Sequence, residues 1–473
     1  MPISEPVSII CNFASWYKEL WKVEDRETFT SEWQFPKSLK WNKISSSKKR
    51  SLCKNFTDME IWSAVNSLGR GKAPEPDGFN VKFYIKYWDI FKDSILLAIQ
   101  EFTTTAHLPD SWGDTNLNFI PKKEGPAKII DYMPIALCNA LYKILPKAIV
   151  NRLQLCMKQL VSQEQCAFIR GKKIHDNILI TNEIVNIVKQ GNIKYFRYKD
   201  MKLSHLAVAD DLLIIIKGNP NNYSNVLKAI NLYCSLTDQR VSKAIFEIFF
   251  PMHCLASVKD EVRKILEFKE GTYPMKYLGA LIGAKKPDTS SQETILHKAI
   301  NKSDGWASKS ISQAGRMTLL NYVMNFLPIH IVSSSWVNSK TINRFQSLAK
   351  NYLWNSKANK KSLHLMGWDK IMLKKGIGGL GIKDLGILKL SIHAKKILPF
   401  LNKDKSLWAR ILNKRYEDYH PWFYRNVNKF SWHFKCLYEA ILVLRDGLRM
   451  RVGNGAKINL WRDPWLSSTP IGK

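Results

Sequence analysis

Two adjacent carboxylates, Asp210 and Asp211, stand between two apolar runs in the segment Leu203–Lys217. Ahead of the pair, Leu206 and Val208 alternate with less apolar residues, and three β-branched isoleucines follow it. This pattern predicts two short strands that meet at a turn, where neighbouring side chains can project together. Two close carboxylates repel each other unless a cation lies between them, and Mg²⁺ prefers oxygen ligands of this kind. The pair is therefore a candidate Mg²⁺ site, and the alternative is a plain Asp-rich turn.

The chain is strongly basic. It has 473 residues, 72 Lys and Arg against 40 Asp and Glu, and a formal net charge of +32. This excess is larger than solubility requires, so we expect a polyanionic partner, nucleic acid above all. An anionic membrane is the rival, but the sequence has no run of about 18 apolar residues.

The remaining composition bears on location. The N-terminus carries Glu5 and no basic segment, which argues against a signal peptide. The eight cysteines are scattered without any C-x-x-C spacing, which predicts a reduced chain without structural zinc. We therefore expect an intracellular protein, nuclear or cytoplasmic. The sequence does not identify a protein partner.

The positive charge is concentrated in the C-terminal part. Residues 301–473 contain 30 Lys and Arg against 9 Asp and Glu, a net charge of +21, whereas residues 1–300 contain 42 against 31, a net charge of +11. Tryptophans are interleaved with the basic residues, as in surfaces that bind nucleic acid: Trp306, Trp336, Trp354, Trp368 and Trp408. A solvated basic surface is the alternative.

Helical periodicity marks several segments. Thr57 with Glu60 predicts a capping box at the start of a helix, and residues 83–95 carry an aromatic stripe typical of a helix face in the core. Residues 142–160 predict an amphipathic helix with Arg152 on its outer face. The stripe from Ile342 to Tyr352 should turn inward and leave Arg344, Lys350 and Lys357 towards water.

Several segments occur in the order found in one family. Ala209-Asp210-Asp211 and the Leu and Ile residues after it resemble the catalytic hairpin of reverse transcriptases. The local sequence is most similar to that of plant-type LINE (non-LTR) retrotransposons. Further segments resemble the same family: Gly69–Gly78, Phe119–Lys123, Asp131–Leu137, Gln165–Lys172, His175–Leu179, Val241–Ala244, Tyr277–Gly283, Trp306–Arg316, Gly376–Gly381 and Gly453–Trp465.

This resemblance implies roles for individual residues. Asp210 and Asp211 would bind catalytic Mg²⁺, Lys243 would lie near the pyrophosphate leaving group, and Lys122 and Lys123 would contact the nucleotide. The candidate contacts to nucleic acid are Lys72, Arg170, Lys172, Arg316, Arg344 and Lys350.

The chain departs from the family at important positions. Met133 stands where the family has a phosphate-binding Arg, Ala136 has lost a hydroxyl, and Glu75 replaces a Gly. Only 14 residues separate Gln190 from His205, whereas a single βαβ crossover takes about 30. The strand with the first catalytic Asp and the template-gripping segment are therefore missing, and Asp200 is a poor replacement.

We therefore expect an α+β protein with fingers, a truncated palm and a largely helical C-terminal half. The expected divisions are 1–55 as an N-terminal segment and linker, 56–190 as fingers, 191–284 as palm, 285–355 as thumb-like helices and 356–473 as a basic extension. The predicted function is that of an inactive reverse transcriptase relic with vestigial Mg²⁺ binding and sequence-independent nucleic-acid binding. A poorly folded pseudogene product and an active RNA-directed DNA polymerase are the alternatives.

Overall fold

The computed structural model describes most of the chain in segments. These are residues 6–20, 42–69, 76–110, 112–189, 197–198, 201–237, 239, 241–242, 246–251, 253–266, 268–283, 289–307, 311–334, 337–355, 363–416, 419–420, 430–445, 447–456, 458–467 and 469–471. The chain divides into two compact units, Met1–Ser162 and Gln163–Lys473. Each unit is described by itself.

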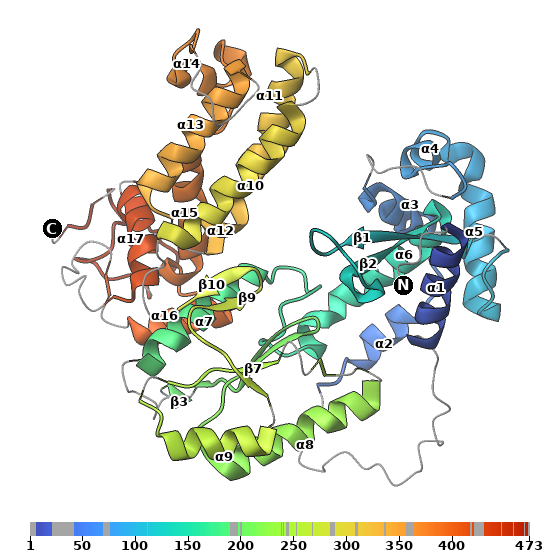
Figure 1. Cartoon of the computed structure of the whole chain (residues 1–473), viewed down its shortest axis with the longest axis horizontal. Coiled ribbons are helices and arrows are strands. Elements are labelled where there is room, and N and C mark those ends of the chain that lie inside the picture. The colour runs from blue at the N-terminus through green and yellow to red at the C-terminus, as the bar shows by residue number, and fades with distance from the viewer. Residues whose placement is uncertain are drawn as a thin grey trace. The chain divides into compact units, whose positions relative to one another are not determined.

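The first unit packs helices beside one β-hairpin (Figure 1). Its elements are α1 (Pro6–Leu20), α2 (Ser46–Leu52), α3 (Asp58–Ser67), α4 (Val81–Lys86), α5 (Trp88–Thr105), β1 (Thr115–Pro121), β2 (Tyr132–Cys138) and α6 (Ala140–Leu160). Strands β1 and β2 pair antiparallel from Thr115 opposite Cys138 to Pro121 opposite Tyr132. The core lies between α3, α4, α5 and α6, where Ile61, Ile99 and Ile144 are completely or almost completely buried.

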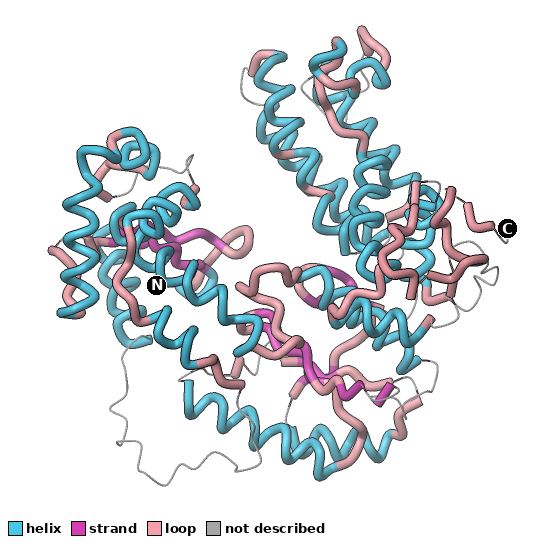
Figure 2. The backbone as a smooth tube through the Cα atoms, turned by 180° about the vertical axis from the view of Figure 1, so that it is seen from behind, coloured by secondary structure: helices cyan, strands magenta, loops and turns pink. Residues whose placement is uncertain are grey.

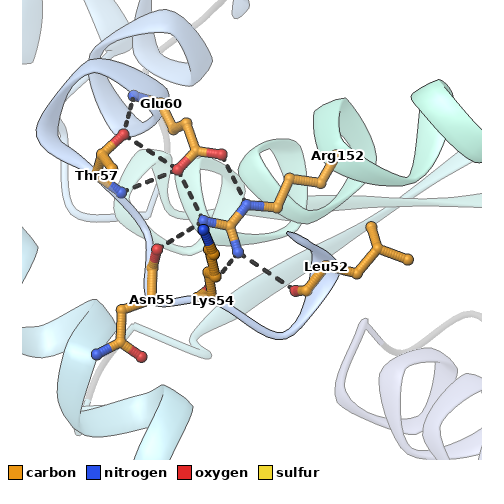
Figure 3. A network of polar contacts seen from close by, with 6 residues as sticks. All are labelled: Leu52, Lys54, Asn55, Thr57, Glu60 and Arg152. Atoms are coloured by element: carbon orange, nitrogen blue, oxygen red, sulfur yellow. Dashed lines mark hydrogen bonds and ion pairs between the residues drawn. The ribbon is translucent and has the colours of Figure 1, made fainter. Parts of the chain in front are cut away.

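Arg152 holds together the start of this unit. The expected capping box of α3 is confirmed, since the Thr57 side chain accepts from the Glu60 amide while Glu60 accepts from the Thr57 amide. The guanidinium of Arg152 on α6 donates to both Glu60 oxygens at 2.7 Å and to carbonyls of the segment before α3 (Figure 3). The prediction that Arg152 faces water is therefore wrong, because its partners satisfy the charge inside the fold.

The aromatic stripe of residues 83–95 is divided between two helices. Helix α4 ends at Lys86, Tyr87 leaves helical geometry, and α5 begins at Trp88. Tyr84 and Ile95 are buried as expected, whereas Tyr87 is exposed. The break places Trp88 against Trp62 of α3, with ring centroids 4.9 Å apart.

The second unit is mainly helical with short two-stranded sheets (Figure 2). Its helices are α7 (Ile174–Lys189), α8 (Pro220–Thr237), α9 (Ala256–Leu266), α10 (Thr289–Ala307), α11 (Gln313–Tyr322), α12 (Ile329–Ser334), α13 (Ser339–Asn355), α14 (Trp368–Met372), α15 (Leu385–Leu401), α16 (Leu407–Arg415) and α17 (Trp432–Arg445). Its strands are β3 (Arg197–Tyr198), β4 (Met201–Lys202), β5 (His205–Val208), β6 (Asp211–Ile214), β7 (Glu247–Ile248), β8 (Lys269–Glu270), β9 (Met275–Tyr277) and β10 (Ala280–Ile282).

Each of these strands pairs with a neighbouring strand in the chain. Strands β3–β4, β5–β6 and β9–β10 form antiparallel pairs, and β7–β8 form a parallel pair. The coarse α+β prediction is confirmed as a mixed, mostly helical fold with small sheets. No helix in the described part of the chain combines the length and apolarity needed to cross a bilayer.

The stripe of α13 turns inward as predicted. Ile342, Phe345 and Tyr352 are buried in a core shared with α10, α11, α12 and α14. Arg344 on the opposite side is exposed, and Lys350 is half-buried. Lys357 lies outside the described residues.

Candidate functional site

The carboxylate pair lies at the turn of the β5–β6 hairpin, as the sequence predicts. Asp210 is in the turn, Asp211 is the first residue of β6 opposite Val208, and both are exposed. The turn begins at Ala209, whose φ of 54° places a residue with a Cβ in the left-handed region. The prediction that both carboxylates are open to solvent at a hairpin tip is confirmed.

Gln165 and Asn177 hold this turn in place. The Gln165 side-chain oxygen accepts the amide of Ala209 at 3.3 Å, and also that of Ala167. The Asn177 side chain, completely buried, donates to the carbonyl of Ala207 at 3.1 Å and accepts from the Cys166 thiol. Residues 164–166 also form a parallel bridge to β5, with amides of Cys166 and Ala207 bonded across it.

The two carboxylates influence each other electrostatically. The pKa of Asp211 is raised, first because the group is partly desolvated and then because the Asp210 charge opposes its ionisation. Tyr277 of β9 lies close enough for the Asp211 charge to raise its pKa, after the larger effect of burial. A cation between Asp210 and Asp211 would relieve this repulsion. The donor set suits Mg²⁺, with two carboxylate oxygens and water completing the shell.

The inner face of the hairpin packs on the C-terminal helices. Leu206 of β5 is completely buried, and with Leu203 it joins a core cluster formed with α7, α15, α16 and α17. The partners from these three C-terminal helices include Phe400, Trp408 and Phe434. Helix α7 contacts both α16 and α17 (Figure 1). The buried face of the hairpin is therefore covered by residues of α7, α15, α16 and α17.

A buried ion pair connects α7 to these helices. Glu183 on α7 is 0% exposed and pairs with Arg415 of α16, 7% exposed, at 2.5 Å. Ser431 and Tyr416 also donate to the Glu183 carboxylate. Burial raises the pKa of Glu183, although Arg415, Ser431 and Tyr416 each lower it.

Buried basic groups gather at the start of α7. Lys396 of α15 is 8% exposed, and burial lowers its pKa to about 7, although the Asp176 charge raises it. In the part of the chain that the structure describes, its Nζ has no hydrogen-bond partner. Burial likewise lowers the pKa of His175 and of His393 to about 4, and that of His433 to about 3. These histidines are therefore neutral near pH 7.

The predicted nucleotide contacts belong to the first unit. Lys122 Nζ donates to the Ile130 carbonyl at 3.0 Å, and Lys123 pairs with Asp131 at 2.9 Å. Lys123 and backbone amides hold the pKa of Asp131 below its usual value. Met133 lies opposite Ile120, and both side chains are about half exposed. An apolar pair therefore occupies this position of the β1–β2 hairpin.

The predicted nucleic-acid contacts differ in their surroundings. Arg344 is exposed and pairs with Glu293, and Arg170 is exposed. Lys350 lies over the Trp368 ring, 5.5 Å from its centroid. Lys172 donates to the Gln165 carbonyl, and burial lowers its pKa.

Arg316 is engaged inside the fold. It donates to the Ile311 and Leu353 carbonyls and so connects α11 to α13. Lys72, Lys243, Asp200 and Glu75 lie outside the described residues.

Sequence reasoning assigned no role to Gln165, Asn177 or Glu183. Gln165 and Asn177 lie in segments that resemble reverse transcriptases, and this resemblance was the signal in the sequence that could have pointed to them. Their function depends on contacts with residues about 30 to 44 positions later, which no local pattern encodes.

The chain is similar to three curated proteins. It is 32% identical over 186 residues to a protein of Arabidopsis thaliana named "Putative ribonuclease H protein". The matched region covers 37% of this chain and 29% of that protein. It is 25% identical over 147 residues to the transposon TX1 uncharacterized 149 kDa protein of Xenopus laevis, with 31% and 11% covered. It is also 25% identical over 148 residues to an uncharacterized mitochondrial protein of Arabidopsis thaliana, with 31% and 96% covered.

No protein-family model matches the chain. The chain spans less than a third of the length of the first two relatives. Of the three relatives, one is named as a putative ribonuclease H protein and one as a transposon protein.

Proposed function

We propose that the chain is a degenerate reverse transcriptase of the LINE type, which no longer polymerises and retains sequence-independent nucleic-acid binding. The observation that carries this proposal is the exposed Asp210–Asp211 turn, anchored by Gln165 and Asn177. The order of the surrounding family-like segments and the relation to transposon-derived proteins support the same reading.

The chemistry of the family explains why we propose inactivity. Nucleotidyl transfer uses two metal ions, held by three carboxylates, and basic groups that clamp the phosphates. This sequence keeps two of those carboxylates and lacks the segment of the first. Among the residues that the structure describes, no three His, Cys, Asp or Glu side chains are arranged to hold a metal. Asp210 and Asp211 would then bind Mg²⁺ weakly, because water must supply most of the shell.

The clamp gives a second argument. A thioether at Met133 cannot donate to phosphate, whereas the arginine it replaces binds phosphate oxygens in pairs. Lys123 is engaged with Asp131, and a nucleotide would have to compete for it.

Primer extension tests the proposal. The full chain should give no product above background on a primed RNA or DNA template with Mg²⁺ or Mn²⁺. Loss of one metal-binding carboxylate should cost orders of magnitude, since about 1.4 kcal/mol of lost transition-state stabilisation is a tenfold change in rate. Extension that disappears in the Asp210→Ala, Asp211→Ala double variant would contradict inactivity and favour the active polymerase.

Nucleic-acid binding is proposed from charge. Residues 301–473 carry a net charge of +21 on a mainly helical region. Binding by counterion release predicts that log affinity falls linearly with log salt. Because phosphates carry no sequence information, unrelated oligonucleotides should bind alike. Fluorescence anisotropy between about 50 and 200 mM salt measures both properties. Failure to bind at the lowest salt would refute this part.

The third possibility is a chain that does not fold. The covering of Leu206 by α15, α16 and α17 argues against it, because the missing strand does not leave this face open. A cooperative thermal transition of the purified chain would support the folded state, and its absence would support the non-folding alternative.

A further inference from the structure

We propose that Trp461 is a stacking platform for an unpaired base of single-stranded nucleic acid, with Arg449, Arg451 and Arg462 contacting the adjoining phosphates. This inference rests on the proposed nucleic-acid binding and adds the form of the ligand and the residues that recognise it. The segment that carries it, Leu448–Leu466, has no role in the reaction discussed above.

Trp461 is unusually open to solvent. Its side chain is 61% exposed, whereas Trp368 is 9% and Trp408 is 2% exposed. Among the tryptophans whose side chains the structure describes, Trp461 alone is largely exposed. Of the tryptophans that the sequence analysis singled out in the basic region, Trp368 and Trp408 are buried in the core. They therefore cannot offer a ring face to a ligand. Trp461 can.

The backbone around Trp461 is fixed by a compact set of hydrogen bonds. The Asn459 side-chain oxygen accepts the amides of Trp461 and Arg462, at 3.2 and 3.1 Å. Asp463 accepts the Asn459 amide at 2.7 Å, and the Asp463 amide returns to the Asn459 carbonyl. Trp465 Nε1 donates to the Leu460 carbonyl at 3.0 Å. An exposed ring on a fixed loop loses little freedom when a base stacks on it, which favours binding.

Three exposed arginines lie within or beside the loop that carries Trp461. The Met450 amide donates to the Pro464 carbonyl at 2.8 Å and brings residues 449–451 beside the loop. Arg449, Arg451 and Arg462 are exposed. The one acidic residue between Leu448 and Lys473 is Asp463, which is engaged with Asn459 and lies 3.5 Å from His420.

These features favour single strands over the other polyanions. An acidic peptide could pair with the arginines but would leave the indole face unused. In a duplex the base faces are already stacked, so only the phosphates remain available. A single strand offers phosphates and free base faces together, and aromatic stacking accepts every base.

The test compares Trp461→Ala with Trp461→Phe in the full chain. The probes are a fluorescein-labelled 20-nucleotide oligo(dT), the matching oligo(U) and a duplex of the same length. Loss of one stacked base should weaken single-strand binding roughly 5- to 150-fold in Trp461→Ala. Trp461→Phe should retain most of the affinity, and the duplex should be affected less. Leu466→Ala is the matched control, because it removes a 69% exposed apolar side chain from the same segment without removing a ring.

The arginines have a separate readout. The Arg449→Gln, Arg451→Gln double variant should reduce the slope of log affinity against log salt by about 1.4 for single strands, at about 0.7 for each phosphate contact. An unchanged slope in the arginine variant, or an unchanged affinity in Trp461→Ala, would overturn the inference. The proposed function would still hold in that case, provided that the wild-type chain binds nucleic acid. Equal losses for single strand and duplex would overturn it as well. If the wild-type chain binds neither probe at about 50 mM salt, the proposed function itself fails.

Discussion

Replacing Arg415 with Met should leave the buried Glu183 carboxylate without its cationic partner. We expect this change to destabilise α7 and the β5–β6 hairpin that packs on it. Glu183 is 0% exposed and its cationic partner 7% exposed, so water cannot replace the lost charge. Removing one partner of a buried pair costs about 3 to 5 kcal/mol. Arg410→Met is a suitable control, because Arg410 lies on the same helix and is exposed. Exposed substitutions usually change stability by less than about 0.5 kcal/mol.

Protonation of Glu183 limits the loss of stability in Arg415→Met. The ordinary pKa of a Glu is 4.5, and neutralising such a group at pH 7 costs about 3.4 kcal/mol at 1.36 kcal/mol per pH unit. At pH 5 the same step costs about 0.7 kcal/mol. In the variant the folded pKa lies above the unfolded pKa, so the folded state binds more protons and stability is lost as pH rises through that window. The difference between wild type and Arg415→Met should therefore be larger at pH 7 than at pH 5.

Hydrogen–deuterium exchange is the appropriate assay, because the two units need not unfold together. In Arg415→Met we expect faster exchange in residues 174–189 of α7 and in residues 205–214 of the hairpin. Residues 58–67 of the first unit should keep their protection. Unchanged protection in α7, or an equal difference at pH 7 and pH 5, would refute the reasoning that Arg415 favours the charged form of Glu183.

Three further predictions concern other sites. Ala209→Gly should stabilise the hairpin by about 0.5 kcal/mol, because relief of left-handed strain exceeds the added chain entropy; faster exchange at residues 205–214 would contradict this. Arg152→Ala should destabilise the first unit by about 2 kcal/mol at pH 7, less than a fully buried pair since Glu60 is partly exposed. The pKa of Glu60 is lowered to about 2, chiefly by Arg152. The stability that this ion pair contributes is therefore present above pH 4.5 and lost towards pH 2. The difference in melting temperature between wild type and Arg152→Ala should be smaller at about pH 3 than at pH 7. Lys396→Met should stabilise the second unit by a few kcal/mol at pH 7, because between the folded pKa of about 7 and the ordinary value of 10.5 the unfolded chain binds this proton more readily. The gain should shrink as pH rises and vanish above pH 10.5, and a lower melting temperature of the variant at pH 7 would contradict the prediction.

Local sequence determined the local elements of this protein. Thr57 and Glu60 specify a helix start because both cap bonds form within three residues. The alternation before Asp210 and the β-branched residues after it specify a hairpin whose partners are adjacent in the chain. The inward stripe of α13 likewise follows from helical periodicity alone. Charge composition predicted a polyanionic partner, which stays a prediction.

Tertiary structure decided how the carboxylate turn is supported. Nothing near Asn177 or Gln165 in the sequence shows that they bond to the turn, because the contacts join segments about 30 to 44 residues apart. Arg152 reads as a surface residue from periodicity, yet its guanidinium satisfies Glu60 and several carbonyls across about 90 residues. Glu183 and Arg415 are separated by 232 residues. A buried charge is stabilised by a partner close in space. Here that partner comes from a distant part of the chain, so these placements could not be derived from the sequence.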